Sequence, residues 1–180
     1  MTKRELAGMV RPWRLQEWFW DNYNRFITTG SALDEGISLR AIIAYAAAVV
    51  ATYLLGSTVS TVSIMTSIGG MGVNVQVTDV LVAVGTDWAG LAGSYLPLIA
   101  LAMVVALPVA GQLHSRMGAP RRTVYLLAGL VAMLALHLIM EATLGLVGFA
   151  AARSIPGLVA QGLSGALGAW VFTRVYPAAP

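Results

Sequence analysis

The sequence predicts an all-α integral membrane protein, a four-helix transmembrane bundle with an N-terminal amphipathic interfacial helix. Two observations indicate this fold class. First, 58% of the 180 residues are hydrophobic and only 11% are charged, whereas soluble domains carry about 25% charged residues. Second, four segments are apolar over the roughly 20 residues that a helix needs to cross a bilayer. These expected spans are residues 39–65, 91–113, 123–143 and 148–175.

The polar and basic N-terminal segment, residues 1–36, is expected to be cytoplasmic and to precede a four-span domain, residues 37–180. Residues 13–27 place apolar and charged side chains on opposite sides of a helix. Trp and Tyr favour the headgroup level, so we expect this helix to lie on the membrane surface; packing on a partner protein is the alternative. The expected interfacial anchors are Trp13, Phe19, Trp20 and Tyr23. No cleavable signal peptide is expected ahead of the first span.

The C-terminal half of the first span is rich in hydroxyl side chains. They are Ser57, Thr58, Ser60, Thr61 and Ser63. Such side chains bond back to the carbonyl group one turn earlier, or across to another helix, so they are tolerated in lipid. We expect a structural role for them, and a polar pore lining is the alternative.

The longest connection between spans, residues 66–90, contains the elements of a short helix. Glycines near its start should end the first span, and residues 73–77 alternate as a strand does. Thr78 or Asp79 is suited to cap a short apolar helix ending at Val84. Such a helix is too short to cross a bilayer. It therefore forms a lid on the outer surface, which we favour, or a re-entrant segment, which protein would have to cover.

Small residues recur every three or four positions on the second and fourth spans. They are Ala102, Ala106 and Ala110 on the second span, and Gly157, Gly165 and Gly168 on the fourth. Small side chains allow two helices to approach closely in a membrane. Because there are more of them than one small bundle uses, we expect self-association or assembly into a larger membrane complex.

The positions of the basic residues predict the orientation of the chain. All of the 11 Lys and Arg residues except Arg153 lie on one side if both termini are cytoplasmic. The positive-inside rule therefore predicts that both termini are cytoplasmic. The whole-chain pattern resembles small inner-membrane proteins of bacteria, so we expect the chain to cross a bacterial inner membrane. Trp88 and Tyr95 would then lie near the outer interface as part of an aromatic belt.

The basic loop between the second and third spans resembles the loop between the second and third helices of major facilitator transporters. The matching positions are Gly111, Arg116, Gly118, Arg121 and Arg122. Ser115 occupies the position of the acidic residue in that family, and this chain has four spans where the family has twelve. We interpret the similarity as convergence on a tight turn with positive charge on the inner side.

Four polar residues of the third and fourth spans are candidates for a ligand or proton pathway. His137 and Glu141 share one face of the third span, and Arg153 and Gln161 share one ridge of the fourth. A charge inside the membrane is costly, so we expect Glu141 and Arg153 to pair near the outer interface. The pair either pins the two spans together or lines a vestibule for protons or a small anion. Catalysis or metal binding by His137 and Glu141, and ligand or lipid binding at the small-residue face, are further alternatives.

Composition argues against catalysis. The chain has no cysteine, which excludes disulfides, thiolate metal sites and thiol nucleophiles. It also lacks an acidic cluster suited to metal or phosphate chemistry, so we expect no enzyme activity, no metal and no cofactor. The net charge of +3 reflects membrane topology, and we expect lipid contacts and no nucleic-acid partner. The sequence thus favours a small non-enzymatic inner-membrane protein; the alternative is a small transporter or channel with a polar pathway near His137, Glu141 and Arg153.

Overall fold

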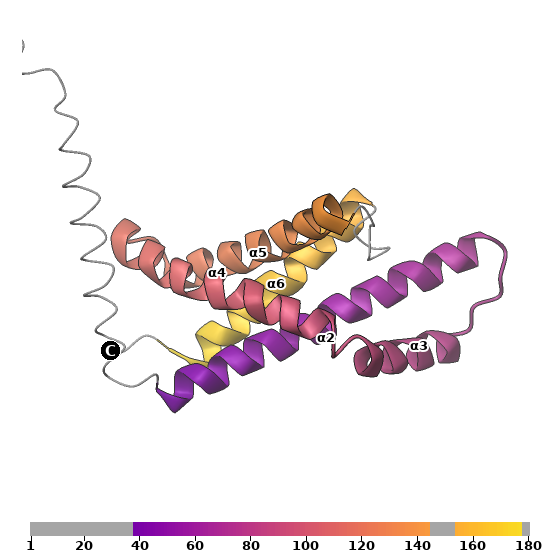
Figure 1. Ribbon diagram of the computed structural model, residues 1–180, viewed down its shortest axis with the longest axis horizontal. Helices are drawn as coiled ribbons and strands as arrows, with labels where there is room; N and C mark the ends of the chain where they lie inside the picture. Colours follow the sequence, from indigo (N-terminus) through magenta and orange to yellow (C-terminus); the bar gives the residue numbers. More distant parts are fainter. Residues whose placement is uncertain (1–37, 145–153, 178–180) are drawn as a thin grey trace, which may run out of the picture. The chain divides into compact units, whose positions relative to one another are not determined.

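A computed structural model describes residues 38–144 and 154–177, which form five helices and no strand. The helices are α2 (Leu39–Gly70), α3 (Val77–Gly90), α4 (Tyr95–Met117), α5 (Arg121–Leu144) and α6 (Ile155–Val175) (Figure 1). All but α3 are long and apolar enough to cross a membrane, which confirms the prediction of four spans and supports a multi-pass membrane protein. The expected interfacial helix, with Trp13, Phe19, Trp20 and Tyr23, lies outside the described residues. Residues Arg40–Pro180 form one compact unit.

The connection between the first two spans differs from the sequence prediction. Residues 73–76 do not form a strand, and α3 continues to Gly90, beyond the predicted end at Val84. The helix begins after Gln76, whose backbone N–H donates to the carboxylate of Asp79 at 2.9 Å. Asp79 therefore caps the helix from inside its first turn and does not precede it.

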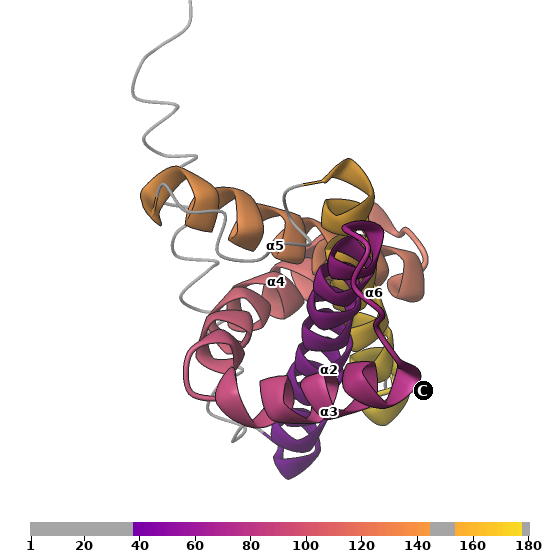
Figure 2. The ribbon, with the colours of Figure 1, turned by 90° about the vertical axis from the view of Figure 1, so that its right-hand side faces the viewer.

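α3 folds back beside the C-terminal half of α2 (Figures 1 and 2). Thr61 donates to the carboxylate of Asp87 at 2.6 Å, and the indole of Trp88 donates to the Thr58 hydroxyl at 3.2 Å. Tyr53 donates to the backbone carbonyl of Trp88. These bonds attach the C-terminal end of α3 to α2. We call the C-terminal part of α2, α3 and their connection, residues 57–90, the α2–α3 hairpin.

Most hydroxyl side chains of α2 donate a hydrogen bond to a backbone carbonyl group of the same helix. Thr58 donates to the Leu54 carbonyl at 2.7 Å, and Ser63 donates to the Val59 carbonyl at 2.8 Å. This is the backbone bonding expected for hydroxyl groups in an apolar environment. It accounts for their presence in α2 without a pore.

The small residues of α6 are used inside the chain. Gly157, Gly165 and Gly168 are buried. A Cβ atom added at Gly165 would collide with the Gly129 carbonyl oxygen of α5 and with the Met133 side chain, and one added at Gly168 would lie 2.7 Å from the Ala48 carbonyl oxygen of α2. The backbones of α6 and its neighbours thus touch directly at these positions.

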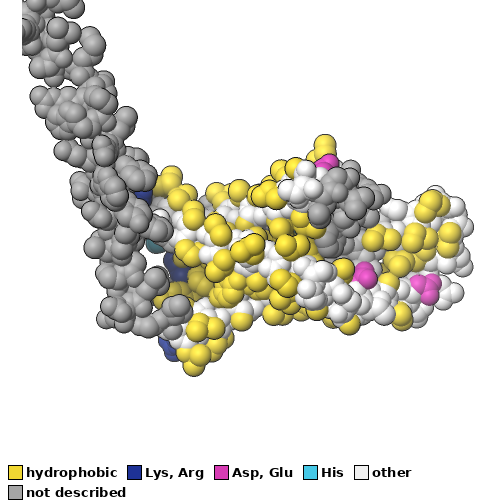
Figure 3. All heavy atoms as spheres, in the orientation of Figure 1, with side chains coloured by type: hydrophobic (Ala, Val, Ile, Leu, Met, Phe, Trp, Pro, Cys, Tyr) yellow, Lys and Arg dark blue, Asp and Glu magenta, His cyan; other side chains and the backbone are white. Residues whose placement is uncertain are grey.

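Charged side chains separate along the described unit. Basic side chains gather at the end that holds the start of α2 and the turn between α4 and α5, and acidic side chains gather toward the opposite end (Figure 3). The described basic residues are Arg40, Arg116, Arg121, Arg122 and Arg174. Their common position at one end is what a positive-inside protein requires.

The contact between α5 and α6 yields a stability prediction. Gly165→Ala should lower the free energy of unfolding by about 1–3 kcal/mol, because the new methyl group must push two backbones apart. Gly85→Ala in α3 is the matched control, since a Cβ there meets nothing within 4 Å. The control should be neutral or stabilising by up to about 1 kcal/mol. Unfolding of both variants in the same detergent checks this, and equal effects would contradict the close contact.

Candidate functional site

A buried polar cluster joins all four spans. Its members are Ser60 on α2, Tyr95 on α4, His137 on α5 and Gln161 on α6, and each is at most 4% exposed. In hydrocarbon, a polar side chain must find its partners within the protein. Their convergence from four helices makes this cluster the candidate site.

Gln161 is the centre of the cluster. Its side-chain amide nitrogen donates to the Gly56 carbonyl at 2.9 Å and to the Ser60 hydroxyl at 2.8 Å, which binds α6 to α2. Its amide oxygen accepts from the Tyr95 hydroxyl at 3.2 Å, which binds α6 to α4. The three bonds use both donors and the acceptor of one side chain.

His137 extends the cluster to α5. Its Nδ1 lies 2.8 Å from the Met133 carbonyl oxygen, which can only accept, so Nδ1 carries a hydrogen. Its Nε2 lies 3.3 Å from the Tyr95 hydroxyl. The two rings meet edge to face, with centroids 6.0 Å apart. The imidazole is therefore fixed in orientation by its own helix and faces α4.

Tyr95 faces two acceptors when His137 is neutral. Its hydroxyl has a single hydrogen, and both His137 Nε2 and the amide oxygen of Gln161 lie within hydrogen-bonding distance. It donates to one of these two groups at a time. A proton added to His137 would let Nε2 donate to Tyr95 while Tyr95 donates to Gln161.

Gly56 makes room for the cluster. A Cβ atom at this position would lie 2.9 Å from the Gln161 amide oxygen and 3.1 Å from the Tyr95 hydroxyl. Sequence reasoning missed both Gly56 and Tyr95. Tyr95 was expected at the outer interface, but it is 1% exposed. A tyrosine at the start of a span gives no signal of its own to separate a belt residue from a buried one.

The structure brings together two of the four predicted site residues. His137 and Gln161 both contact Tyr95, so they belong to one cluster. Glu141 is exposed one turn beyond His137. Arg153 lies outside the described residues, so the Glu141–Arg153 pair stays a prediction.

The predicted packing alanines of α4 have two environments. Ala110 is fully buried in the core, whereas Ala102 and Ala106 are half-buried and line a groove against α5. In the bundle, one further polar atom stands out. The Ser57 hydroxyl is buried and has no hydrogen-bond partner among the described residues.

Within the described ranges, no group of three or more His, Asp and Glu side chains could bind a metal ion. The chemistry available to the cluster is hydrogen bonding and proton exchange at one imidazole. No family model matches the chain, and neither a curated protein nor a solved structure is significantly similar to it.

The cluster can be tested by a double-mutant cycle. Gln161→Leu should lower the free energy of unfolding by about 1–3 kcal/mol, because it leaves buried partners on α2 and α4 unsatisfied. Combined with Tyr95→Phe, the loss should be smaller than the sum by about 0.5–2 kcal/mol, since the two residues share a bond.

Gln112→Leu supplies the matched control, because Gln112 is exposed on α4. Its free energy of unfolding should lie within about 0.5 kcal/mol of that of the unchanged protein. Strict additivity of Gln161→Leu and Tyr95→Phe would show that the two side chains do not interact.

Proposed function

We propose that the protein is a non-enzymatic multi-pass protein of the bacterial inner membrane that associates with copies of itself, or with a larger membrane complex, through the α2–α3 hairpin. The observation behind this proposal is a set of large apolar side chains exposed on the hairpin. They include Ile64, Met71, Val73, Val77, Leu81 and Val82, the last four of which are between 55% and 76% exposed. Exposed apolar surface outside a lipid environment commonly marks a site of association.

The length of α2 supports association at the hairpin. Its 32 residues extend about 48 Å, whereas the hydrocarbon layer is about 30 Å thick. Even a tilt of about 40°, the upper end of the usual range, leaves roughly 37 Å along the bilayer normal. The C-terminal end of α2 and the start of α3 therefore reach the headgroup level or beyond, where lipid tails cannot cover apolar side chains.

The small-residue ridge of α6 no longer motivates association. Gly165 and Gly168 are consumed by contacts within the chain. Self-association would therefore involve the hairpin, because the α6 glycines already contact other helices of the same chain.

The orientation belongs to the same proposal. The basic end of the described unit, with Arg116 and Arg122, would lie in the cytoplasm, and the hairpin would lie on the outer side. Both termini would then be cytoplasmic. The N-terminal amphipathic segment, with Trp13 and Trp20, would rest on the inner membrane surface.

A cysteine-free chain permits clean cross-linking. In native membranes, Leu81→Cys should give a disulfide-linked dimer on mild oxidation, because the hairpins of two copies meet. Leu127→Cys is the matched control, since Leu127 is similarly exposed but lies on α5. It should give several-fold less dimer.

Equal dimer yields at the two positions would remove the hairpin interface. If neither position cross-links and the protein migrates as a lone monomer on native gels of membranes, both forms of association are excluded. The orientation is read from Ser115→Cys, which an impermeant maleimide should label only after the membrane is opened.

A small proton-conducting transporter or channel is the second candidate function. The favouring observation is a buried imidazole, His137, whose Nε2 lies 3.3 Å from the Tyr95 hydroxyl, so the two groups are placed to exchange a proton. A pathway would continue through Glu141 and Arg153, as the sequence predicts.

The measurement is proton flux into vesicles reconstituted with the full chain. His137→Ala should abolish flux above that of empty vesicles, because it removes the proton acceptor. His114→Ala is the control, since this histidine lies near the α4–α5 turn and contacts the Ala119 carbonyl. Flux that is unaltered by His137→Ala, or absent from the unchanged protein, would exclude this function.

A further inference from the structure

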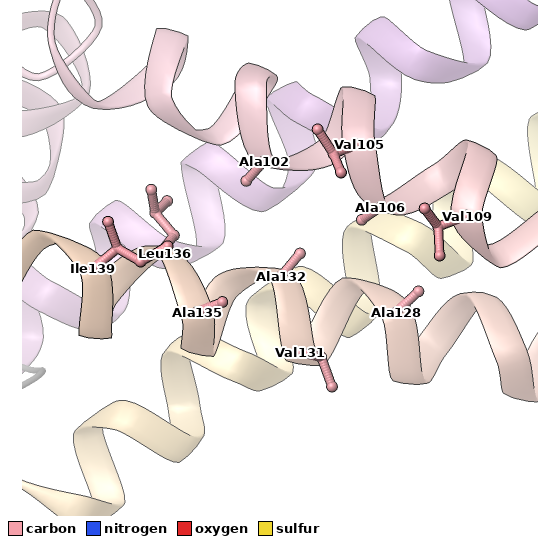
Figure 4. Close-up of a pocket in the computed structure, with 10 residues that line it drawn as sticks. All are labelled: Ala102, Val105, Ala106, Val109, Ala128, Val131, Ala132, Ala135, Leu136 and Ile139. Carbon is pink, nitrogen blue, oxygen red and sulfur yellow. The ribbon is translucent and has the colours of Figure 1, made fainter. Parts of the chain in front are cut away.

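An apolar groove runs between α4 and α5. It has a volume of about 320 Å³ and ten lining residues, all of them aliphatic. Five are alanines: Ala102 and Ala106 on α4, and Ala128, Ala132 and Ala135 on α5. Figure 4 shows the α4 and α5 side chains on the two sides of the groove. Methyl groups opposite one another are too small to fill the space between two helices, so the groove stays open.

Water does not suit this groove. Its lining offers no hydrogen-bonding side chain, and buried water needs two to four polar partners. Both helices that form the groove are long and apolar enough to span a membrane. In a bilayer, the material that meets such a surface is lipid hydrocarbon, which fills irregular gaps by dispersion contacts.

The face of α4 that lines the groove continues to an arginine near the end of the helix. Arg116 follows Val109 by seven residues and Val105 by eleven, so the three share one side of the helix. At a rise of about 1.5 Å per residue, Arg116 begins about 10 Å beyond Val109. The side chain of Arg116 is exposed, and no ion pair involving it is present in the described ranges.

The surroundings of Arg116 are also positive. Arg122 is exposed in the first turn of α5, where free backbone N–H groups favour anions. Arg121 is differently engaged. It donates to the Tyr176 carbonyl at 2.6 Å and lies 5.0 Å from the centre of the Tyr125 ring. This end of the groove therefore lies next to a positively charged turn between α4 and α5.

We propose that this groove binds one acyl chain of an anionic membrane phospholipid, with the headgroup phosphate at Arg116. The order of an apolar channel followed by positive charge matches the order of acyl chain and phosphate in the lipid. A second helix fits less well. Such a helix, about 10 Å wide, would place only its side chains in this groove, whereas one acyl chain lies along it.

The test uses the full chain in mild detergent, stripped of lipid. Thermal unfolding and native mass spectrometry are recorded with added phosphatidylglycerol, or with phosphatidylcholine of the same acyl chains. Phosphatidylglycerol should bind more tightly and raise the unfolding temperature more. Arg116→Gln should reduce this preference by about five-fold, the effect of one basic residue near an anionic lipid.

Three further variants separate the effect of the Arg116 charge from the effect of the groove volume. Arg174→Gln removes an arginine that stacks on Trp170 of α6, away from the groove, and should keep the lipid preference. Ala132→Leu fills the groove and should weaken binding of both lipids, whereas Ala142→Leu, at an exposed position of α5, should not. Unchanged unfolding of each variant without lipid shows that the fold is intact.

Each other outcome overturns the proposal. Equal binding of the two lipids, or an unchanged preference in Arg116→Gln, removes the phosphate site. Full stabilisation by glycerol phosphate, which has no acyl chain, would show that the groove does not bind an acyl chain. Dimerisation that Ala132→Leu abolishes would show that a second copy occupies the groove.

Discussion

The bundle depends on the side-chain amide of Gln161. In hydrocarbon, every polar group must be satisfied by the protein, so one amide with two donors and one acceptor fixes the positions of its partners. It binds Gly56 and Ser60 on α2 and Tyr95 on α4, and Tyr95 contacts His137 on α5. The remaining contacts between spans are largely apolar and tolerate sliding better. The amide network therefore sets the register of four helices.

Glycines give this network its space. Gly56 lacks the Cβ atom that would displace the amide of Gln161, and Gly165 allows the backbones of α5 and α6 to touch. The same small residues cannot also serve an external interface. The sequence pattern of small residues indicated close helix packing, and the structure shows that the packing of α6 is internal.

The four spans could be predicted from the sequence because a membrane-spanning helix is recognised from the length of one continuous apolar segment. His137 and Gln161 could be identified as candidates because polar side chains are conspicuous in apolar segments. Their partners could not, since Gly56 and Gln161 are separated by 105 positions. The start of α3 was displaced because Asp79 caps it from the third helical position. Its C-terminal end was missed because Asp87 is held by Thr61 of α2, 26 positions earlier, a contact that leaves no local signal. Arg153 lies outside the described residues, so its proposed pairing is not tested.

α2 is one unbroken helix on which consecutive residues serve different neighbours. Ser60 accepts from Gln161 of α6, and Thr61 donates to Asp87 of α3. A continuous helix is a stiff rod, so it transmits rotation and tilt along its axis with little loss. A pull or twist applied to α3 from outside would reach the amide of Gln161 within a single residue of α2. The α2–α3 hairpin and the buried cluster are therefore mechanically coupled through α2.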